Sequence, residues 1–444
     1  MWYRVGATWA ASREAGGQAR VFDKSAMTHK LRYRLLLVAA AAGALAALAA
    51  CRKDASTSSP APIPVLKSGT GGGPSASVAK PLDAPSDARP QPRAPAAPCL
   101  ASTGGHDPAL PELLDQASRD FEGGRYEDAL ECAREATRTD PTSVAAHHFR
   151  GAALAELGHI EEARTAYARA LAIDPDDPEV LRSSADLHVR RLGARDDLEL
   201  ALQYVKRALP RAHKIRDRSL LKELHLLEAM ALDDLGRPAD ALAASTKALE
   251  YEPKDREARR EKGVALFELC KFDQAKHELS RLANEVPDAW AEHYLGLIAE
   301  RAQDDMAAAA HFARAHKLDP DAFKGTSQTP RSVFQKIVQE EVDKLPPAVK
   351  AGLARADFEV TELPEVKDLV ATDPPLSPGI LGLFRPPPES APSDAKPTIL
   401  LYRRNLARAA HNDDELRREV RDTLMHEVGH LNGEDDEQLR DRGL

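Results

Sequence analysis

The central part of the chain repeats its small residues and its prolines at a fixed spacing. Pro141 and Pro175 lie 34 positions apart, as do Pro253 and Pro287. Alanines and glycines keep the same period: Ala129, Ala163, Ala241, Ala275 and Ala308, preceded by Gly151, Ala229, Gly263 and Gly296. The period predicts paired helices in which small residues mark the closest approach and proline separates the units. Three larger side chains are expected to fill the seam between the paired helices, namely Tyr167, Leu279 and Phe312.

This pattern resembles tetratricopeptide repeats, with about six units between Pro108 and Phe323. The unit from Pro178 to Asp217 is longer than the others and is expected to carry an inserted turn. Such arrays stack into a solenoid whose inner face binds peptides or proteins. The resemblance therefore implies a protein or peptide partner on the repeat groove. We interpret the histidines of the array as packing or surface residues: His147, His148, His293 and His311.

A different pattern marks the end of the chain, where residues 331–444 are expected to form a separate, small domain. Apolar residues recur every three or four positions, which predicts one helix with a single buried stripe. Asn412 or Asp413 can cap the start of this helix, and acidic residues in its first turn suit the positive end of its dipole. Gly433 is placed to end it in the left-handed conformation. The stripe consists of Leu416, Val420, Leu424, Val428 and Leu431.

The predicted helix carries two histidines and a glutamate beside this stripe. His426 and His430 are four residues apart and therefore lie one above the other on the same helix face. Each can donate a ring nitrogen to one Zn²⁺ ion, and Glu427 is placed to act as general base toward water. This is the short signature of zinc peptidases. The alternative is a polar helix face with two solvated histidines.

The residues after the helix extend this motif to His-Glu-x-x-His-x-x-Gly-x-x-Asp. If the chain turns back at Gly433, the Asp436 carboxylate can become a third metal ligand. Three protein ligands and one water are the arrangement of catalytic zinc. Asp435 and Glu437 compete for the same role. The spacing resembles the extended motif of the metzincins with Asp in place of the third His, but no methionine follows it, so the Met-turn of that group is missing.

A closer resemblance is to the small bacterial zincin-like metallopeptidases, over about the last 110 residues, from Ser332 to Leu439. Members share an amphipathic helix, short strands, an arginine-containing turn and the motif helix. The corresponding segments here are Val333–Leu345, Phe358–Val360, Leu381–Phe384 and Ile399–Arg403. The resemblance implies an α+β fold, a bound Zn²⁺ and peptide-bond hydrolysis. The chain departs from the family at Leu431 and Asn432, where a second His and an aromatic residue are usual.

Two further roles are suggested within this domain. The strand from Ile399 to Tyr402 is a candidate edge along which a peptide substrate adds as a further strand, or it is an ordinary half-buried strand. Tyr402 and His411 are polar residues that could stabilise an oxyanion, although their spacing does not distinguish them from other polar side chains.

The start of the chain has the pattern of an export signal. Leu35 to Ala50 is an unbroken run of Ala, Leu, Val and Gly, which is short for a membrane span and suits a signal-peptide core. Lys30 precedes it on a basic flank, and Met27 is a better start than Met1. The run ends in Leu-Ala-Ala-Cys, which resembles a bacterial lipobox in which Cys51 is lipidated. Residues 1–50 are therefore expected to be an N-terminal extension and lipoprotein signal peptide, and the mature protein an outer-membrane lipoprotein on the periplasmic or cell-surface side.

Residues 51–107 are rich in Pro, Ala, Ser and Gly and are expected to form a disordered tether, because they cannot bury enough apolar surface to offset ordering. None of the four cysteines forms a C-x-x-C pair, which excludes a cysteine zinc site. A disulfide between Cys99 and Cys132 is conceivable outside the cytoplasm. The net charge of −9 argues against a nucleic-acid partner.

The sequence thus predicts a mainly α chain, with a tetratricopeptide-repeat solenoid (108–323) followed by a small α+β zincin-like domain (331–444). The predicted function is that of a lipid-anchored zinc metallopeptidase. Glu427 is its predicted general base, and His426, His430 and Asp436 are the predicted metal ligands. The alternative is a repeat scaffold, without turnover, that carries a zinc-binding module.

Overall fold

The structure is a computed structural model that describes residues 99, 108–323, 329–387, 390, 392, 394–435, 438, 439 and 442. Its fold is the expected one: tetratricopeptide-type helices followed by a small domain with a few strands. The chain divides into two compact units, with the boundary between Leu224 and His225 inside one helix. The predicted signal peptide, Cys51 and almost all of the tether lie outside the described residues.

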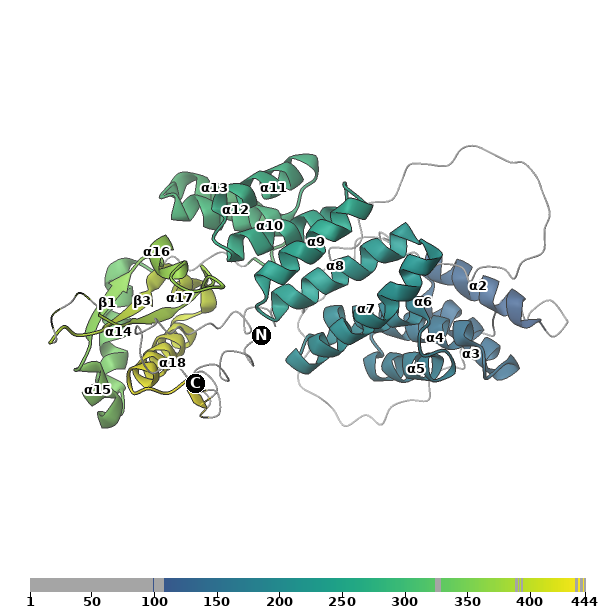
Figure 1. Ribbon diagram of the computed structural model, residues 1–444, viewed down its shortest axis with the longest axis horizontal. Helices are drawn as coiled ribbons and strands as arrows, with labels where there is room; N and C mark the ends of the chain where they lie inside the picture. The colour runs from purple at the N-terminus through teal and green to yellow at the C-terminus, as the bar shows by residue number, and fades with distance from the viewer. Residues whose placement is uncertain are drawn as a thin grey trace, which may run out of the picture. The chain divides into compact units, whose positions relative to one another are not determined.

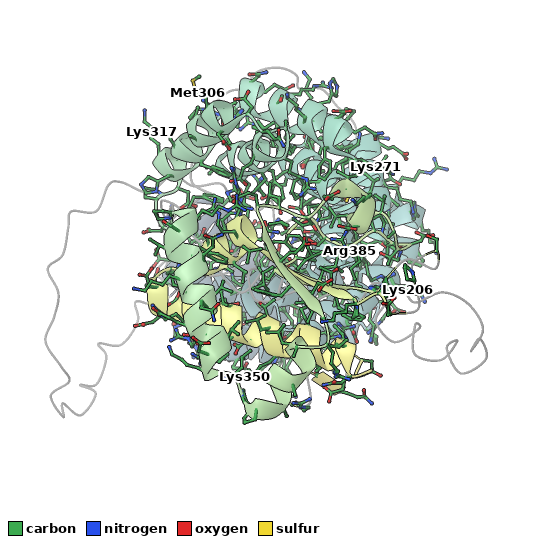
Figure 2. All side chains as sticks on the ribbon, turned by 90° about the vertical axis from the view of Figure 1, so that its left-hand side faces the viewer. Lys206, Lys271, Met306, Lys317, Lys350 and Arg385 are labelled. Atoms are coloured by element: carbon green, nitrogen blue, oxygen red, sulfur yellow. A yellow bond between two sulfur atoms is a disulfide. The ribbon has the colours of Figure 1, made fainter. Side chains whose placement is uncertain are left out.

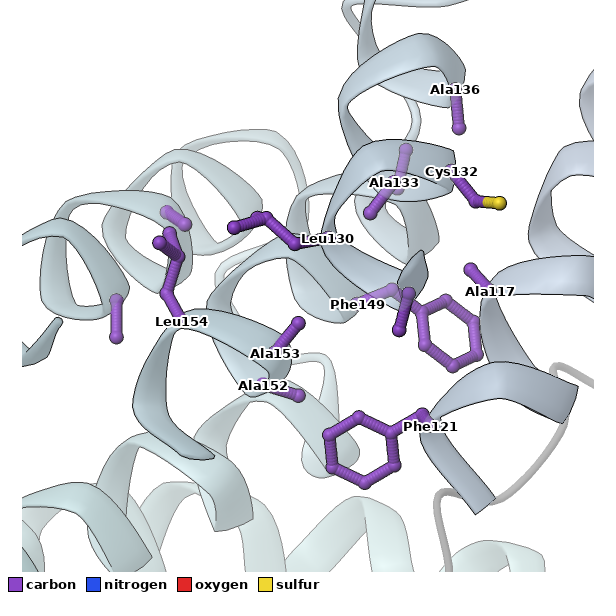
Figure 3. Packing of buried hydrophobic residues seen from close by; sticks show 14 of the residues in the cluster. Ala117, Phe121, Leu130, Cys132, Ala133, Ala136, Phe149, Ala152, Ala153 and Leu154 are labelled. Atoms are coloured by element: carbon purple, nitrogen blue, oxygen red, sulfur yellow. The ribbon is translucent and has the colours of Figure 1, made fainter. Parts of the chain in front are cut away.

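The first unit contains the helices of three repeats (Figure 1). Their bounds are α2 (Leu110–Glu122), α3 (Tyr126–Thr139), α4 (Val144–Glu156), α5 (Ile160–Ile173), α6 (Pro178–Leu187) and α7 (Arg195–Ile215). Alanines on neighbouring helices allow close packing, and the rings of Phe121 and Phe149 fill the space beside them (Figure 3). Glycines with positive φ, such as Gly124 and Gly158, turn the chain between paired helices. Glycine suits these positions because residues with a side chain adopt positive φ only at a steric cost.

The third repeat is longer than its neighbours, as the sequence predicted. After α6 the chain forms one π-helical segment, His188–Leu192, and Gly193 with φ of 67° ends it. Helix α7 then runs for 21 residues and holds Pro210 inside it. The extra length is therefore a π turn plus an extended second helix.

The second unit begins within α8 and continues the repeats. The helices are α8 (Arg218–Asp234), α9 (Pro238–Tyr251), α10 (Arg256–Glu268), α11 (Phe272–Glu285), α12 (Ala289–Arg301) and α13 (Asp305–Leu318). The seam residues are confirmed here. A Cβ on Gly263 would lie 2.6 Å from the side chain of Leu279, and one on Gly296 would lie 2.6 Å from the ring of Phe312. A glycine is present at each position because the facing side chain already occupies that space.

The second unit ends in the α+β domain. It consists of α14 (Arg331–Lys344), α15 (Pro347–Leu353), β1 (Asp357–Thr361), α16 (Val366–Leu369), β2 (Gly382–Arg385), β3 (Thr398–Tyr402), α17 (Arg403–Ala409) and α18 (Asp413–Leu431). The three strands form one sheet in the order β1-β3-β2, with β1 parallel and β2 antiparallel to β3. Helix α18 contacts both β2 and β3 and packs against α14 (Figure 1).

Four of the five residues of the predicted stripe of α18 are buried, and Leu431 at its end is half-buried. Leu416, Val420 and Leu424 pack with Phe334 and Ile337 of α14 in one apolar cluster, and each is at most 2 % exposed. Burying side chains of this size stabilises the fold by about 2 kcal/mol each. Asn412 caps the helix, since its side chain accepts a hydrogen bond from the Glu415 backbone N–H. These contacts fix the rotation of α18 about its axis and hence the direction of its histidines.

The suggestion that Ile399–Tyr402 is a sheet edge is wrong. These residues belong to β3, which pairs with β1 on one side and β2 on the other. Both rows of backbone groups are thus used, so no peptide can add there. The run is apolar on both faces because it is the central strand, and four of its five residues are buried. The arginine expected in the following turn, Arg403, starts helix α17.

The last repeats contact the α+β domain within the second unit. Arg408 and Arg404 of α17 pair with Glu300 at the end of α12, and Arg404 also pairs with Asp305. Arg301 donates a hydrogen bond of 2.8 Å to the Pro364 carbonyl oxygen. The repeats and the domain thus share an interface of ion pairs that ranges from half-buried (Glu300 with Arg408) to exposed (Asp305). Among the residues that the structure describes, no helix combines the length and the apolar character needed to span a bilayer.

The conceivable disulfide between Cys99 and Cys132 is present. Cys132 lies on α3 and is fully buried, and Cys99 is 2 % exposed. The Cys99 backbone N–H also donates to the Glu135 carboxylate at 3.2 Å. The bond therefore attaches the chain that precedes the repeats to the second helix of the first repeat.

We predict that removing this bond destabilises the first unit. Replacing Cys99 by Ser and Cys132 by Ala opens a loop with a sequence separation of 33, and this should lower the free energy of unfolding by about 3 kcal/mol because the unfolded chain regains entropy. Urea denaturation followed by circular dichroism measures the loss. Cys270→Ser, at a cysteine outside the disulfide, is the matched control. If wild type unfolds at the same urea concentration with and without reductant, the prediction is contradicted.

Candidate functional site

His426 and His430 lie together in the last two turns of α18. Their ring centroids are 4.7 Å apart and the ring planes make an angle of 84°. Both side chains are 3 % exposed, and Glu427 between them is 0 % exposed. The helix spacing therefore brings two imidazoles and a carboxylate into one largely water-excluded place, where electrostatic interactions are stronger than in water.

The tautomer of His430 follows from its contact with the chain beyond the helix. Its Nδ1 lies 2.9 Å from the backbone carbonyl oxygen of Glu434. A carbonyl can only accept, so Nδ1 carries a proton, and in the neutral ring this leaves the lone pair on Nε2. A histidine oriented in this way by a backbone carbonyl is typical of metal ligands, because the contact fixes the ring and raises its basicity.

The chain turns back at the end of α18, as predicted. Gly433 has a φ of 90°, a conformation that favours glycine, and the Glu434 N–H bonds to the Gly429 carbonyl at 3.0 Å. Gly429 makes room for the returning segment, because a Cβ there would overlap Leu439 and lie 2.9 Å from a Glu434 carboxylate oxygen. Residues on both sides of Asp436 therefore contact the helix turn that carries the histidines.

The returning segment separates the competing acidic residues. Asp435 and Gln438 cap each other, with each side chain accepting from the other's backbone N–H at 2.9 Å. The Glu434 carboxylate pairs with Arg442. Two of the four acids of the tail thus have structural partners. Asp436 and Glu437 lie outside the described residues, and within the described ones no group of three or more His, Cys, Asp or Glu side chains is arranged to hold a metal ion.

Glu427 is held against the start of β2. A Cβ added to Gly382 would lie 2.9 Å from Glu427 Oε1 and 2.6 Å from the Thr423 methyl group. The carboxylate therefore occupies the space that a side chain at position 382 would need. Gly382 was singled out by the sequence only as part of a family segment, and its contact with the glutamate was not foreseen.

The two residues suggested for oxyanion stabilisation lie elsewhere. Tyr402 is buried with Leu400 and Leu383 on the sheet face opposite α18. Burial raises the pKa of Tyr402, and the Asp368 and Glu427 carboxylates raise it further. Among the described residues its hydroxyl has no hydrogen-bond partner. His411 is exposed and precedes α18, about 20 Å along the helix from His426.

Charged residues near the sheet complete the surroundings. Arg385, at the end of β2 (Figure 2), lies 3.7 Å from the Asp368 carboxylate. On the other side of α18, the fully buried Glu341 of α14 accepts from Arg421 Nε at 2.9 Å and from Lys344 at 2.8 Å. Sequence analysis missed Glu341, because nothing in the pattern of one helix shows that an arginine 80 residues later will face it.

Comparison with known families identifies both parts of the chain. Residues 353–444 match the family model of zincin-like metallopeptidases, and residues 114–178 and 234–300 match models of the tetratricopeptide repeat. The chain carries tetratricopeptide repeats followed by a zincin-like metallopeptidase domain. The family models thus confirm both resemblances and their order along the chain.

Curated relatives match parts of the chain. It is 25 % identical over 230 residues, or 51 % of its length, to a tetratricopeptide repeat and J domain-containing co-chaperone of Cryptococcus neoformans. It is 37 % identical over 73 residues, or 16 % of its length, to the protein CTR9 homolog of Arabidopsis thaliana. The chain spans 44 % and 7 % of the length of these two relatives.

Two solved structures match about half of the chain, both with TM-scores below 0.5. A structure titled for pilF of Pseudomonas aeruginosa has 18 % sequence identity and a TM-score of 0.42, and the match covers 48 % of this chain and 92 % of that one. PilW, a type IV pilus biogenesis factor, has 19 % identity and a TM-score of 0.43, with 48 % and 96 % covered.

We predict that Gly429→Ala displaces the returning segment. The added methyl overlaps Leu439, so the Glu434 and Leu439 amides should lose protection from hydrogen exchange, and Zn²⁺ affinity should fall about tenfold or more because the His430 orientation is lost. Gly379→Ala, where a Cβ has ordinary room beside Ser377, is the control. Unchanged exchange in the Gly429 variant would refute this account of the segment.

Proposed function

We propose that this chain is a zinc-dependent peptidase tethered to a membrane by an N-terminal lipid, with its repeats binding a protein partner or substrate. The observation that carries the proposal is the close pair of His426 and His430 with Glu427 between them, buried in a domain of the zincin-like family. A solvated histidine pair, the alternative to a metal site, would not be 3 % exposed on both rings.

The donor set suits Zn²⁺. His426 and His430 would hold it through ring nitrogens, with Asp436 as the third ligand that the sequence predicts. Three protein ligands of this kind leave one position for water or substrate. A bound zinc ion supplies Lewis acidity, which makes water nucleophilic near neutral pH and polarises a peptide carbonyl.

Glu427 performs the proton transfers in this proposal. Its carboxylate takes a proton from the attacking water and delivers it to the nitrogen of the leaving amine. Its packing against Gly382 at the start of β2 fixes its position, so it need not reorganise during the reaction. The absence of a side chain at position 382 is what allows the carboxylate to lie beside the strand.

The sheet offers a place for an extended substrate next to this glutamate. β2 is an outer strand of the described sheet, and its first residue, Gly382, contacts Glu427. A peptide that adds to β2 by main-chain hydrogen bonds would place a carbonyl near the carboxylate. β2 therefore takes the role that the sequence suggested for β3.

Location is also part of the proposal. The apolar run from Leu35 to Ala50 followed by Cys51 supports lipidation and an outer-membrane lipoprotein. The disulfide between Cys99 and Cys132 supports an oxidising compartment, since such bonds are rare in the cytosol. The matched tetratricopeptide repeats support a protein partner.

A second candidate is a scaffold that binds zinc without turnover. The observation in its favour is the deep burial of the site, because Glu427 is 0 % exposed and both histidines are nearly so. A peptide would need movement of the surrounding chain to reach the carboxylate.

We predict that Glu427→Gln separates the two candidates. The amide keeps the shape and the metal ligands, so zinc content should stay at about one per chain, while cleavage of a quenched-fluorescent peptide library falls about a hundredfold or more because the base is lost. His426→Ala and His430→Ala should lose both zinc and cleavage. A library that wild type and the Gln variant cleave equally, or not at all, would favour the scaffold.

We predict that Cys51→Ala releases the protein from membranes. Without the thiol no lipid can be attached, so the protein should move from the membrane pellet to the soluble fraction and lose labelling by a fatty-acid analogue. Cys270→Ala is the control. Continued labelling of the Cys51 variant would count against the lipid anchor.

A further inference from the structure

Glu300, in the last repeat, connects the repeats to the α+β domain through two half-buried arginines. Its Oε1 lies 3.1 Å from Arg404 and its Oε2 lies 2.5 Å from Arg408 Nη1. The Glu300 side chain is 10 % exposed and that of Arg408 is 17 % exposed. Burial lowers the pKa of the Arg408 guanidinium, with Glu300 opposing that shift. Arg408 thus depends on Glu300, because an uncompensated buried charge is strongly unfavourable.

Arg408 in turn sets the orientation of Asn405 on the same helix. Arg408 Nη2 donates to Asn405 Oδ1 at 2.6 Å. Asn405 is 5 % exposed, and its amide can adopt either of two orientations related by a flip. A donor at Oδ1 selects the orientation in which Nδ2 points the other way. Glu300 and Arg408 together therefore determine where the Asn405 N–H groups are directed.

Those N–H groups hold the chain that leads into β2. Asn405 Nδ2 donates to the Ile380 carbonyl at 2.6 Å and to the Pro378 carbonyl at 2.9 Å. The Tyr402 backbone N–H takes the next carbonyl, that of Leu381, at 2.9 Å. The following residue is Gly382, whose backbone lies against Glu427. Three successive links thus run from the repeats to the segment that seats the glutamate.

We propose that Glu300 is a positioning residue of the peptidase site, acting through Arg408 and Asn405 on the segment 378–382 against which Glu427 lies. The inference rests on the proposed function, and it makes the last repeat part of the support of the site. A displacement of about 1 Å at a reacting group can cost a hundredfold in rate. Loss of Glu300 therefore affects the chemical step rather than substrate binding.

A neighbouring ion pair provides a matched control. Asp305 also pairs with α17, through Arg404 at 2.8 Å, but it is 70 % exposed. Among the described residues, no hydrogen bond or ion pair joins Asp305 to Arg408 or Asn405, so its pair with Arg404 belongs to the interface without reaching Asn405. Asp305→Ala thus removes a charge pair from the same interface and leaves the links to Asn405 in place.

The test compares Glu300→Ala, Asn405→Asp and Asp305→Ala in the full chain loaded with zinc, on a peptide that the wild type cleaves. We expect kcat to fall about tenfold or more in the first two variants, with KM and zinc content unchanged, and to stay within about twofold in the third. The double variant Glu300→Ala with Asn405→Asp should have a kcat no lower than that of the less active single variant, because both residues act on one chain of contacts.

Hydrogen exchange over residues 378–382, the segment that Asn405 and Tyr402 hold, provides a readout that needs no catalysis. Exchange should rise in Glu300→Ala and Asn405→Asp and not in Asp305→Ala. An unchanged kcat in Glu300→Ala, or equal losses in Glu300→Ala and Asp305→Ala, would overturn the proposal. If wild type hydrolyses no peptide, the proposed function fails. Hydrogen exchange then tests the contacts from Glu300 to segment 378–382 by itself, and equal exchange in wild type and Glu300→Ala would overturn them.

Discussion

The candidate metal site depends on the last two turns of one helix. A rise of 1.5 Å per residue puts His426 and His430 on one face, and the buried stripe of α18 fixes which way that face points. Gly433 then lets the chain return over Gly429, so that a backbone carbonyl orients His430. Each of these features is local in sequence, yet together they place two imidazoles and a carboxylate where water is scarce.

Much of this arrangement follows from the sequence because it depends on short-range periodicity. The spacing of leucines and valines is enough to locate α18 and its buried side, and Asn412 and Gly433 mark its ends. The repeat helices are predictable for the same reason, since a glycine or alanine opposite each large seam residue recurs with the period. The long third repeat is also visible as a change in that period.

Other parts were not predictable, because they depend on which segments meet in space. Strand order is an example: the apolar run at β3 fits an edge or a central strand equally well until its two neighbours are known. In the sequence, Gly382 looks like any glycine before an apolar pair, although in the structure the Glu427 side chain packs against its backbone. The contacts of Glu341 with Arg421 and of Glu300 with Arg408 join residues that no local pattern relates.

The most direct test of the account is anomalous X-ray scattering at the zinc edge from crystals of the full chain. The account predicts a single peak bonded at about 2.0–2.1 Å to ring nitrogens of His426 and His430, with an Asp436 oxygen as third protein ligand and a water in the fourth position. A peak bound by four protein side chains, or zinc bound elsewhere with the two imidazoles apart, would contradict it.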